Sequence, residues 1–155
     1  MLNYLSTIRG AVHIFVRVAD ALGIQWHLVA DNDPGGEKYI EGARTYLNGR
    51  NEADHITKLS KTNMEVLLCC SGYGKPYEDG VPESKISELT GEKGSIDYCL
   101  QVYKAVKDIR SFSKPAAAME AIMLMQQKGP DNVPSEIKGI VDKTIALTEG
   151  FDDNI

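Results

Sequence analysis

The sequence predicts an α/β fold, in which a small parallel sheet is followed by a helical C-terminal half. Three observations lead to this prediction. A short and almost continuously apolar run at residues 24–30 has the character of a buried parallel strand. The segments on both sides of this run repeat their apolar residues with helical spacing. From Ser95 onward the spacing is helical throughout.

The first elements are predicted as helix, strand and helix. Residues 11–22 form an amphipathic helix that stops at Gly23, with an apolar face made of Ala11, Ile14, Phe15, Val18 and Leu22. The strand at residues 24–30 follows directly. Residues 37–47 form the second helix, which residues 48–51 end, and its inward side chains are Tyr39, Ile40, Ala43 and Leu47.

The middle of the chain carries weaker signals. Residues 54–59 are predicted to form a second strand, and residues 62–70 a short helix. Thr62 at the N-cap of this helix, with Glu65 three residues later, fits a capping box. Residues 71–94 are rich in Gly, Pro, Ser and charge, which indicates a loop with one helical turn near residues 83–89.

Three helices are predicted in the C-terminal half. One has an apolar stripe of Ile96, Cys99, Leu100, Tyr103, Val106 and Ile109. The next begins at Lys114-Pro115 and ends at Gly129-Pro130, with a stripe of Ala118, Met119, Ile122 and Met125. Pro134 opens the last, with Ile137, Ile140, Val141 and Ile145 inward, and residues 151–155 are expected to fray.

Length and composition indicate one ordinary globular domain over residues 1–155, with an α/β part at 8–70 and a helical extension at 95–149. Hydrophobic residues make up 43% of the 155 residues and charged residues 25%. The sequence shows neither a run of about 20 apolar residues nor a signal peptide, so we expect a cytoplasmic protein without a membrane span. The net charge of −5 argues against strong non-specific binding of nucleic acid by this chain alone.

The three cysteines, Cys69, Cys70 and Cys99, are odd in number and form no Cys-x-x-Cys pair. They are therefore expected to be free thiols in a reducing compartment, rather than a disulfide framework or a zinc site. The three histidines, at positions 13, 27 and 55, share no spacing. We expect packing or surface roles for them.

Asp31 and Asp33 follow the first predicted strand and precede a helix, at the edge of an α/β sheet where ligands bind. At an extended strand end, residues i and i+2 point the same way. Two carboxylates aimed at one point repel each other unless a cation lies between them, and such oxygen ligands suit Mg²⁺ or Mn²⁺. The sequence therefore predicts a divalent-metal site here.

The same motif has three competing interpretations. An EF-hand loop would need Glu where Gly42 stands, and a helix before it, so it is rejected. A phosphatase of the haloacid-dehalogenase type would need a hydroxyl where Gly35 stands. A plain turn, in which Asp31 caps the following helix and residues 33–36 reverse the chain, remains open.

Residues 26–39, WHLVADNDPGGEKY, resemble the second acidic motif of a TOPRIM domain. The resemblance is closest to the C-terminal TOPRIM domain of OLD-family ATP-dependent endonucleases. Residues 63–68 resemble the family's acidic residue at the head of a short helix, and residues 113–120 resemble its lysine-bearing helix start. The final helix after Val133-Pro134 also fits, so the similarity runs from residue 8 to residue 148.

The resemblance implies a TOPRIM-like, Rossmann-like fold and metal-dependent hydrolysis of phosphodiester bonds in DNA by a two-metal mechanism. It implies that Asp31 and Asp33 are metal ligands and that Glu65 is a ligand or general base. Glu37 would orient a water molecule at the metal, and Lys114 would neutralise charge on the scissile phosphate. Two alternatives stay open, in which Glu65 is only the capping partner of Thr62 and Lys114 is an ordinary solvated lysine.

The sequence departs from the family in two places. It contains no Gly-x-x-x-x-Gly-Lys-Ser/Thr loop, so ATP would act only through a separate ATPase domain or subunit. The family's first Glu motif also has no match, because Asp20 falls inside the first helix. We expect a truncated reading frame, a fragment or a split gene, with a partner chain or self-association covering the sheet edge.

The main alternative function is a non-catalytic TOPRIM remnant that acts in dimerisation or in docking an ATPase. A primase-like or topoisomerase-like TOPRIM domain ranks low, because neither a tyrosine nucleophile nor a zinc-binding segment stands out.

Overall fold

The structure, a computed structural model, describes residues 12–149. Predictions for residues 1–11 and for the tail at 151–155 lie outside the described part. The chain divides into two compact units, which we call unit 1 (residues 1–60 and 136–155) and unit 2 (residues 61–135). The prediction of a single domain over residues 1–155 stays a prediction.

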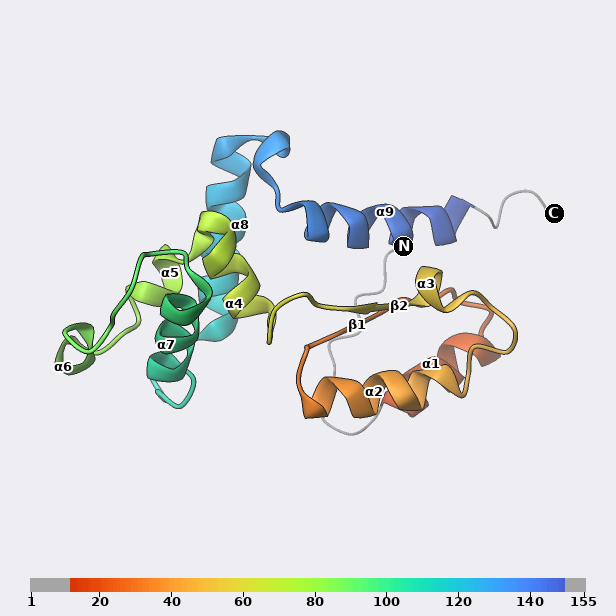
Figure 1. The fold of residues 1–155 in the computed structure, drawn as a ribbon. Coiled ribbons are helices and arrows are strands. Elements are labelled where there is room, and N and C mark those ends of the chain that lie inside the picture. Colours follow the sequence, from red (N-terminus) through yellow and green to blue (C-terminus); the bar gives the residue numbers. More distant parts are fainter. Residues whose placement is uncertain (1–11, 150–155) are drawn as a thin grey trace. The chain divides into compact units, whose positions relative to one another are not determined.

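Unit 1 is built on a two-stranded parallel sheet of β1 (Leu28–Ala30) and β2 (Ile56–Lys58), in which Leu28 pairs with Ile56. Helices α1 (Val12–Ala21) and α2 (Pro34–Arg44) lie on one side of the sheet, and α9 (Ser135–Glu149) lies on the other (Figure 1). This confirms the coarse prediction of an α/β fold with a small parallel sheet.

Both strands are shorter than predicted. β1 takes only the last three residues of the apolar run at 24–30, and the short helix α3 (Glu52–His55) occupies the start of the second predicted strand. A strand exists only where a neighbour supplies its hydrogen bonds, and β2 offers three residues. Hydrophobicity alone therefore overestimates the length of β1.

The core of unit 1 consists of Val12, Val16, Ala30, Ile40, Ala43 and Ile56. Helix α1 buries a different side from the predicted one, since Ile14, Val18 and Leu22 are 52%, 50% and 67% exposed. The prediction of the packed face of α1 is therefore wrong. The apolar residues of this helix cover more than half of its circumference, so the periodicity does not decide which part of that face packs, and contact with α2 does.

Helix α2 begins three residues earlier than predicted, at Pro34, and ends at Arg44. Its N-cap is Asp33, whose Oδ1 accepts a hydrogen bond of 2.7 Å from the backbone N–H of Gly36. Proline suits the first helical position because its fixed φ is already helical. The predicted inward residues Ile40 and Ala43 are buried, whereas the alternative with Asp31 as the cap is wrong.

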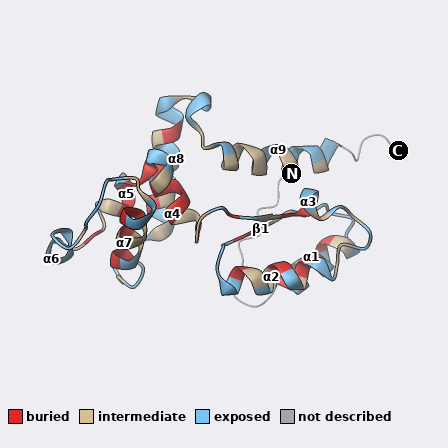
Figure 2. Ribbon diagram, viewed as in Figure 1, coloured by how far each residue is buried: buried red, intermediate tan, exposed pale blue. Residues whose placement is uncertain are grey.

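Helix α9 contacts the sheet side of unit 1 through polar groups. The carboxylate of Glu136 accepts hydrogen bonds from the backbone N–H and the hydroxyl of Ser60, and Lys143 Nζ donates to Thr57 Oγ1 over 3.3 Å. No described residue of α9 is buried, as Figure 2 shows. The prediction that Ile137, Ile140, Val141 and Ile145 face inward is therefore only partly correct. The first two are half-buried, whereas Val141 and Ile145 are 49% and 47% exposed, because two short strands offer little apolar surface.

Unit 2 is helical. Helix α4 (Met64–Leu68) runs into a π-helical turn (Cys69–Tyr73), which is followed by α5 (Lys75–Glu78) and α6 (Glu83–Ile86). Helices α7 (Ile96–Val106) and α8 (Lys114–Lys128) and a 3₁₀ turn (Pro130–Asn132) complete it. The segment predicted as loop thus contains two helical turns besides the predicted one, which is α6. Its core includes Val66, Leu67, Tyr73, Tyr77, Cys99, Val102, Val106 and Ala121.

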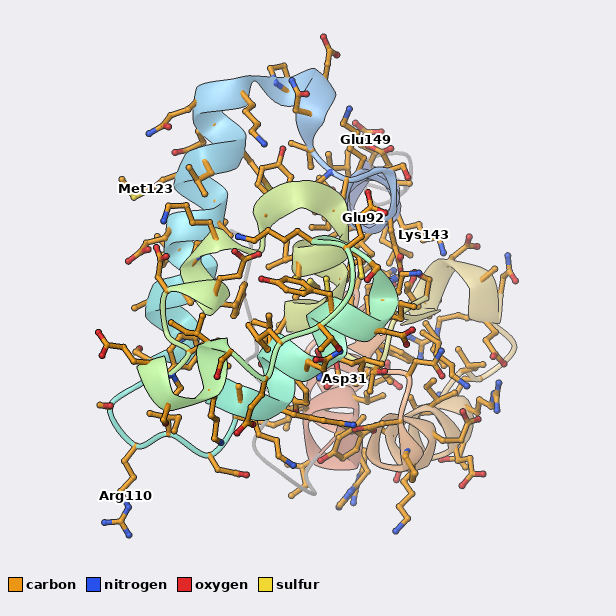
Figure 3. All side chains as sticks on the ribbon, turned by 60° about the vertical axis from the view of Figure 1, so that its left-hand side comes forward. Asp31, Glu92, Arg110, Met123, Lys143 and Glu149 are labelled. Carbon is orange, nitrogen blue, oxygen red and sulfur yellow. The ribbon has the colours of Figure 1, made fainter. Side chains whose placement is uncertain are left out.

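Helix α8 also turns a different side inward from the one predicted. Ala117, Ala121 and Met125 are buried, whereas Met119 and Ile122 are 59% and 44% exposed, which corrects the predicted stripe except at Met125. Figure 3 shows Met123 pointing outward from this helix. Small alanines allow the close approach of neighbouring helices, so the packed side follows the alanines rather than the larger residues.

In α7 the predicted stripe is partly correct. Cys99 and Val106 are buried, and Leu100 and Tyr103 are half-buried, but Ile96 is exposed. All three cysteines are free thiols, as predicted. Among the described helices, none is long and apolar enough to cross a membrane.

Candidate functional site

The loop after β1 carries the first two predicted site residues, Asp31 and Asp33. Gly36, in the first turn of α2, packs against the backbone of Asp31 so closely that a Cβ atom at position 36 would overlap the carbonyl oxygen of Asp31. Only glycine allows this approach. The loop is therefore fixed between the end of β1 and the first turn of α2, which places both aspartates at the carboxyl end of a parallel strand.

The donor chemistry of this loop fits a hard divalent cation, because carboxylate oxygens are the ligands that Mg²⁺ and Mn²⁺ prefer. One oxygen of Asp33 already accepts the N–H of Gly36, which orients the carboxylate. In the described part of neither unit do three His, Cys, Asp or Glu side chains gather closely enough to hold a metal ion. Asp31 and Asp33 alone would thus form a partial ligand set.

Glu37 lies in the first turn of α2 and pairs with the cations of Lys58 and Arg44. Its carboxylate is 2.9 Å from Lys58 Nζ and 3.8 Å from Arg44 Nη1. The hydrogen bond from Lys58 lowers the pKa of Glu37, so the carboxylate stays ionised. The predicted role of Glu37 in orienting water at a metal stays a prediction, and it would require this carboxylate to exchange Lys58 for the water.

In unit 2 the structure brings together Glu65 and Lys114, the two predicted catalytic residues. Lys114 Nζ lies 2.9 Å from Glu65 Oε1, and the two side chains are 41% and 18% exposed. Glu65 occupies the first turn of α4, and Lys114 is the first residue of α8. Ser113 caps α8 by accepting the N–H of Ala116. Two helix starts that are far apart in the sequence therefore present opposite charges to each other.

One of the two plain alternatives for this pair is wrong. The N-cap of α4 is Asn63, whose Oδ1 accepts the N–H of Val66 over 2.9 Å, so Glu65 is not the capping-box partner of Thr62. Lys114 is 41% exposed and paired with Glu65, so the alternative of a solvated lysine stays open. The roles of Glu65 and Lys114 in catalysis stay predictions.

Two tyrosines that the sequence pattern did not assign to the site lie beside this pair. The ring of Tyr103 on α7 has its centroid 5.0 Å from Lys114 Nζ. Tyr77 on α5 is buried, and burial together with the negative charge of Glu65 raises its pKa to about 12, so its phenol stays protonated. Tyr77 lies in a segment that the sequence predicts as loop, so no periodic pattern points to it. The sequence pattern places Tyr103 only in a packing stripe.

In unit 1, a series of hydrogen bonds through His27 and Thr57 connects β2 and α9. His27 Nδ1 lies 2.7 Å from the carbonyl oxygen of Asp54, and His27 Nε2 lies 3.0 Å from Thr57 Oγ1. A carbonyl can only accept, so Nδ1 carries the proton and Nε2 accepts from Thr57. Burial, with a smaller effect from the nearby charge of Lys143, lowers the pKa of His27. Both ring nitrogens of His27 are thus engaged in hydrogen bonds within unit 1.

Comparison with known proteins finds a distant relative. The chain is 29% identical over 140 residues to the uncharacterized protein YbjD of Escherichia coli (strain K12). The match covers 87% of this chain and 23% of YbjD, so the chain spans less than a quarter of the length of this relative. No family model matches the chain, and no solved structure matches it. The similarity is therefore to one part of a longer protein.

Proposed function

We propose that this chain provides a TOPRIM-type, metal-dependent DNA endonuclease centre of the OLD-family kind. In this proposal Asp31 and Asp33 bind Mg²⁺ or Mn²⁺, and Glu65 serves as a further ligand or general base. Lys114 neutralises charge on the scissile phosphate. DNA is the substrate, ATP acts through a separate ATPase domain or subunit, and the protein works as a homo-oligomer in the cytoplasm.

The observation that carries the proposal is the ion pair between Glu65 and Lys114. The sequence hypothesis assigns both residues to one reaction, although they come from separate helices, α4 and α8. Folding places their charged groups 2.9 Å apart at two helix starts. A helix N-terminus favours an anion, so a phosphate that approaches Lys114 would also meet the positive end of α8.

The chemistry assigns separate tasks to the residues. A bound divalent cation would supply electrostatic stabilisation of the phosphate and lower the pKa of the attacking water. Asp31 and Asp33 would hold the cation through oxygens that the β1–α2 loop keeps in place. Glu65 would accept a proton from the attacking water, and Lys114 would stabilise the negative charge on the phosphate oxygens.

Metal binding is the first test, because Asp31 and Asp33 alone form a partial ligand set. Titration with Mn²⁺ by calorimetry compares the wild type with Asp31→Asn and Asp33→Asn. Asparagine at position 33 keeps the acceptor for the N–H of Gly36 and removes the charge, so the helix cap survives. Glu41→Gln is the matched control, because Glu41 is an exposed carboxylate of the same helix. We expect Mn²⁺ binding that both aspartate variants lose and the control keeps.

Nicking of supercoiled plasmid DNA with Mn²⁺ is the second test. Lys114→Met is expected to lower the rate about 100-fold or more, as the loss of a charge-stabilising group does. Lys104→Met, which removes an exposed lysine of α7, should leave the rate unchanged. Equal nicking rates for the wild type and Lys114→Met would contradict the proposal. Mn²⁺ binding that is unchanged in Asp31→Asn and in Asp33→Asn would also contradict it.

The second candidate function is a non-catalytic module for dimerisation or for docking an ATPase. The exposed apolar residues of α1, Ile14, Val18 and Leu22, favour it, since they form a side of the helix that no part of described unit 1 buries. Light scattering of the wild type and of Val18→Asp distinguishes the two candidates. A dimer that the substitution dissociates, in a protein that neither binds Mn²⁺ nor cleaves DNA, would favour the module.

A further inference from the structure

The ammonium group of Lys114 meets partners of two different kinds within unit 2. One partner is the carboxylate of Glu65, 2.9 Å away, and the other is the ring of Tyr103, with its centroid 5.0 Å away. The three residues come from α4, α7 and α8, and α4 packs against α7. Lys114 is thus held by two groups. The carboxylate of Glu65 is charged and can pair with another cation instead, whereas the ring of Tyr103 carries no net charge.

We propose that Tyr103 is a positioning residue, whose ring face holds the ammonium group of Lys114 in place independently of Glu65. The role of Lys114 in phosphate binding rests on the proposed function, whereas its placement by Tyr103 does not. When Glu65 turns from Lys114 to a metal ion or a proton, the ring keeps the ammonium group directed at the same point.

The physical reason lies in what each partner does to the charge. The carboxylate of Glu65 neutralises the ammonium, so an anionic substrate has to compete with it. An aromatic ring attracts a cation through its quadrupole and leaves the net charge unchanged. Lys114 held by Tyr103 therefore keeps its positive charge for a phosphate, and the flexible four-carbon side chain stays ordered while the anion arrives.

Tyr103 belongs to a helix that packs into the core of unit 2. It is half-buried on α7, and its neighbours on the helix, Val102 and Val106, are each 1% exposed. The attraction comes from the ring and not from the hydroxyl, so phenylalanine should replace tyrosine without loss. Leucine keeps an apolar side chain of similar burial and removes the ring, which makes Tyr103→Phe and Tyr103→Leu a matched pair.

The test uses nuclear magnetic resonance of the side-chain methylene groups in ¹³C-lysine-labelled protein, with Lys114 assigned by Lys114→Arg. Protons above a ring face are shifted upfield by the ring current. We expect upfield Lys114 signals in the wild type, in Tyr103→Phe and in Glu65→Gln, and ordinary positions in Tyr103→Leu. Lys128, whose Nζ lies 4.6 Å from the ring centroid of Tyr73, is the internal reference, and its unchanged signals show that each variant is folded.

Two results would overturn the proposal. One is a Tyr103→Leu protein in which the Lys114 signals stay upfield. The other is a Glu65→Gln protein in which they return to ordinary positions, since Glu65 would then be the group that holds Lys114. Nuclease assays separate this proposal from the proposed function: Tyr103→Leu should lower kcat/KM about tenfold and Tyr103→Phe should not. If the Lys114 signals are upfield as expected but the wild type does not cleave DNA, the proposed nuclease function is refuted and the role of Tyr103 is not.

Discussion

At the scale of single residues, Gly36 shows how a backbone contact positions a candidate site. The first turn of α2 approaches the chain at Asp31 so closely that no side chain fits between them. The same turn supplies the N–H that orients Asp33. The two aspartates are therefore held by backbone geometry and by one capping hydrogen bond, both of which depend on a residue that has no side chain.

Replacement of Gly36 by alanine should destabilise the protein by about 2 kcal/mol or more, because the new Cβ atom would meet the carbonyl oxygen of Asp31. Urea unfolding measures the change. Gly42→Ala in the same helix is the control: nothing lies within 4 Å of the place that its Cβ atom would take, so higher helix propensity should stabilise by up to about 1 kcal/mol. Equal effects of the two substitutions would contradict the close contact at Gly36.

His27 should make stability depend on pH. Burial lowers its pKa in the folded protein below the ordinary value of 6.5. The unfolded chain therefore binds a proton more readily, and stability rises with pH in this range. The contribution of His27 is present above pH 6.5 and is lost as the pH falls below 6.5 through the lower folded pKa.

Unfolding in urea at a series of pH values between about 5 and 8 tests this dependence. His27→Gln should flatten the part of the curve below about pH 6.5 that belongs to this residue. His13→Gln is the control, since His13 is an exposed side chain of α1. If the unfolding free energy of His27→Gln still falls steeply toward acid pH, groups other than His27 cause the pH dependence.

At the scale of elements, the starts of helices carry much of the local specificity. Asp33, Asn63 and Ser113 each cap a helix, α2, α4 and α8 respectively, by accepting a backbone N–H. All three helices then present a predicted site residue in their first turn: Glu37 on α2, Glu65 on α4 and Lys114 on α8. The caps thus set the register in which the charged side chains leave the helices.

Asn63→Ala should destabilise unit 2 by about 1 to 2 kcal/mol, because its buried Oδ1 accepts the N–H of Val66. Asn63→Asp keeps the acceptor and should lose less. Thr62→Ala should change the unfolding free energy by less than about 0.5 kcal/mol, since Thr62 precedes the cap. Chemical denaturation of the three variants measures these differences, and a larger loss at Thr62 than at Asn63 would restore the capping-box interpretation.

At the scale of the whole molecule, the described part of the chain has two cores. One lies between α1, α2 and the sheet of unit 1, and the other lies among the helices of unit 2. Each core contains buried valines, with Val16 in unit 1 at 5% exposure and Val102 in unit 2 at 1%. A substitution in one core should therefore act mainly on the unit that contains it.

Hydrogen exchange measured by mass spectrometry tests this division. Val102→Ala should speed exchange in α4 and α7 more than in β1 and β2, and Val16→Ala should do the reverse, because each opens a cavity in one core. Equal acceleration in both units by either substitution would instead indicate one cooperative domain over residues 1–155.

Several features were predictable from the sequence because their causes are local. The parallel strand pair, the helix after the Asp-rich loop and the start of α8 at Lys114 follow from apolar runs, a proline and capping residues. The loop at Asp31 and Asp33 was located correctly at the end of β1 for the same reason.

The tertiary structure decided what local pattern leaves open. Helices α1 and α8 carry apolar residues on more than one side, so only packing selects Val16 over Val18, and Ala121 over Ile122. The contact between Glu65 and Lys114, and the ring of Tyr103 beside it, depend on how α4, α7 and α8 pack together. The sequence identifies which side chains carry charge. The distance between two such side chains is set only when the helices that carry them pack together.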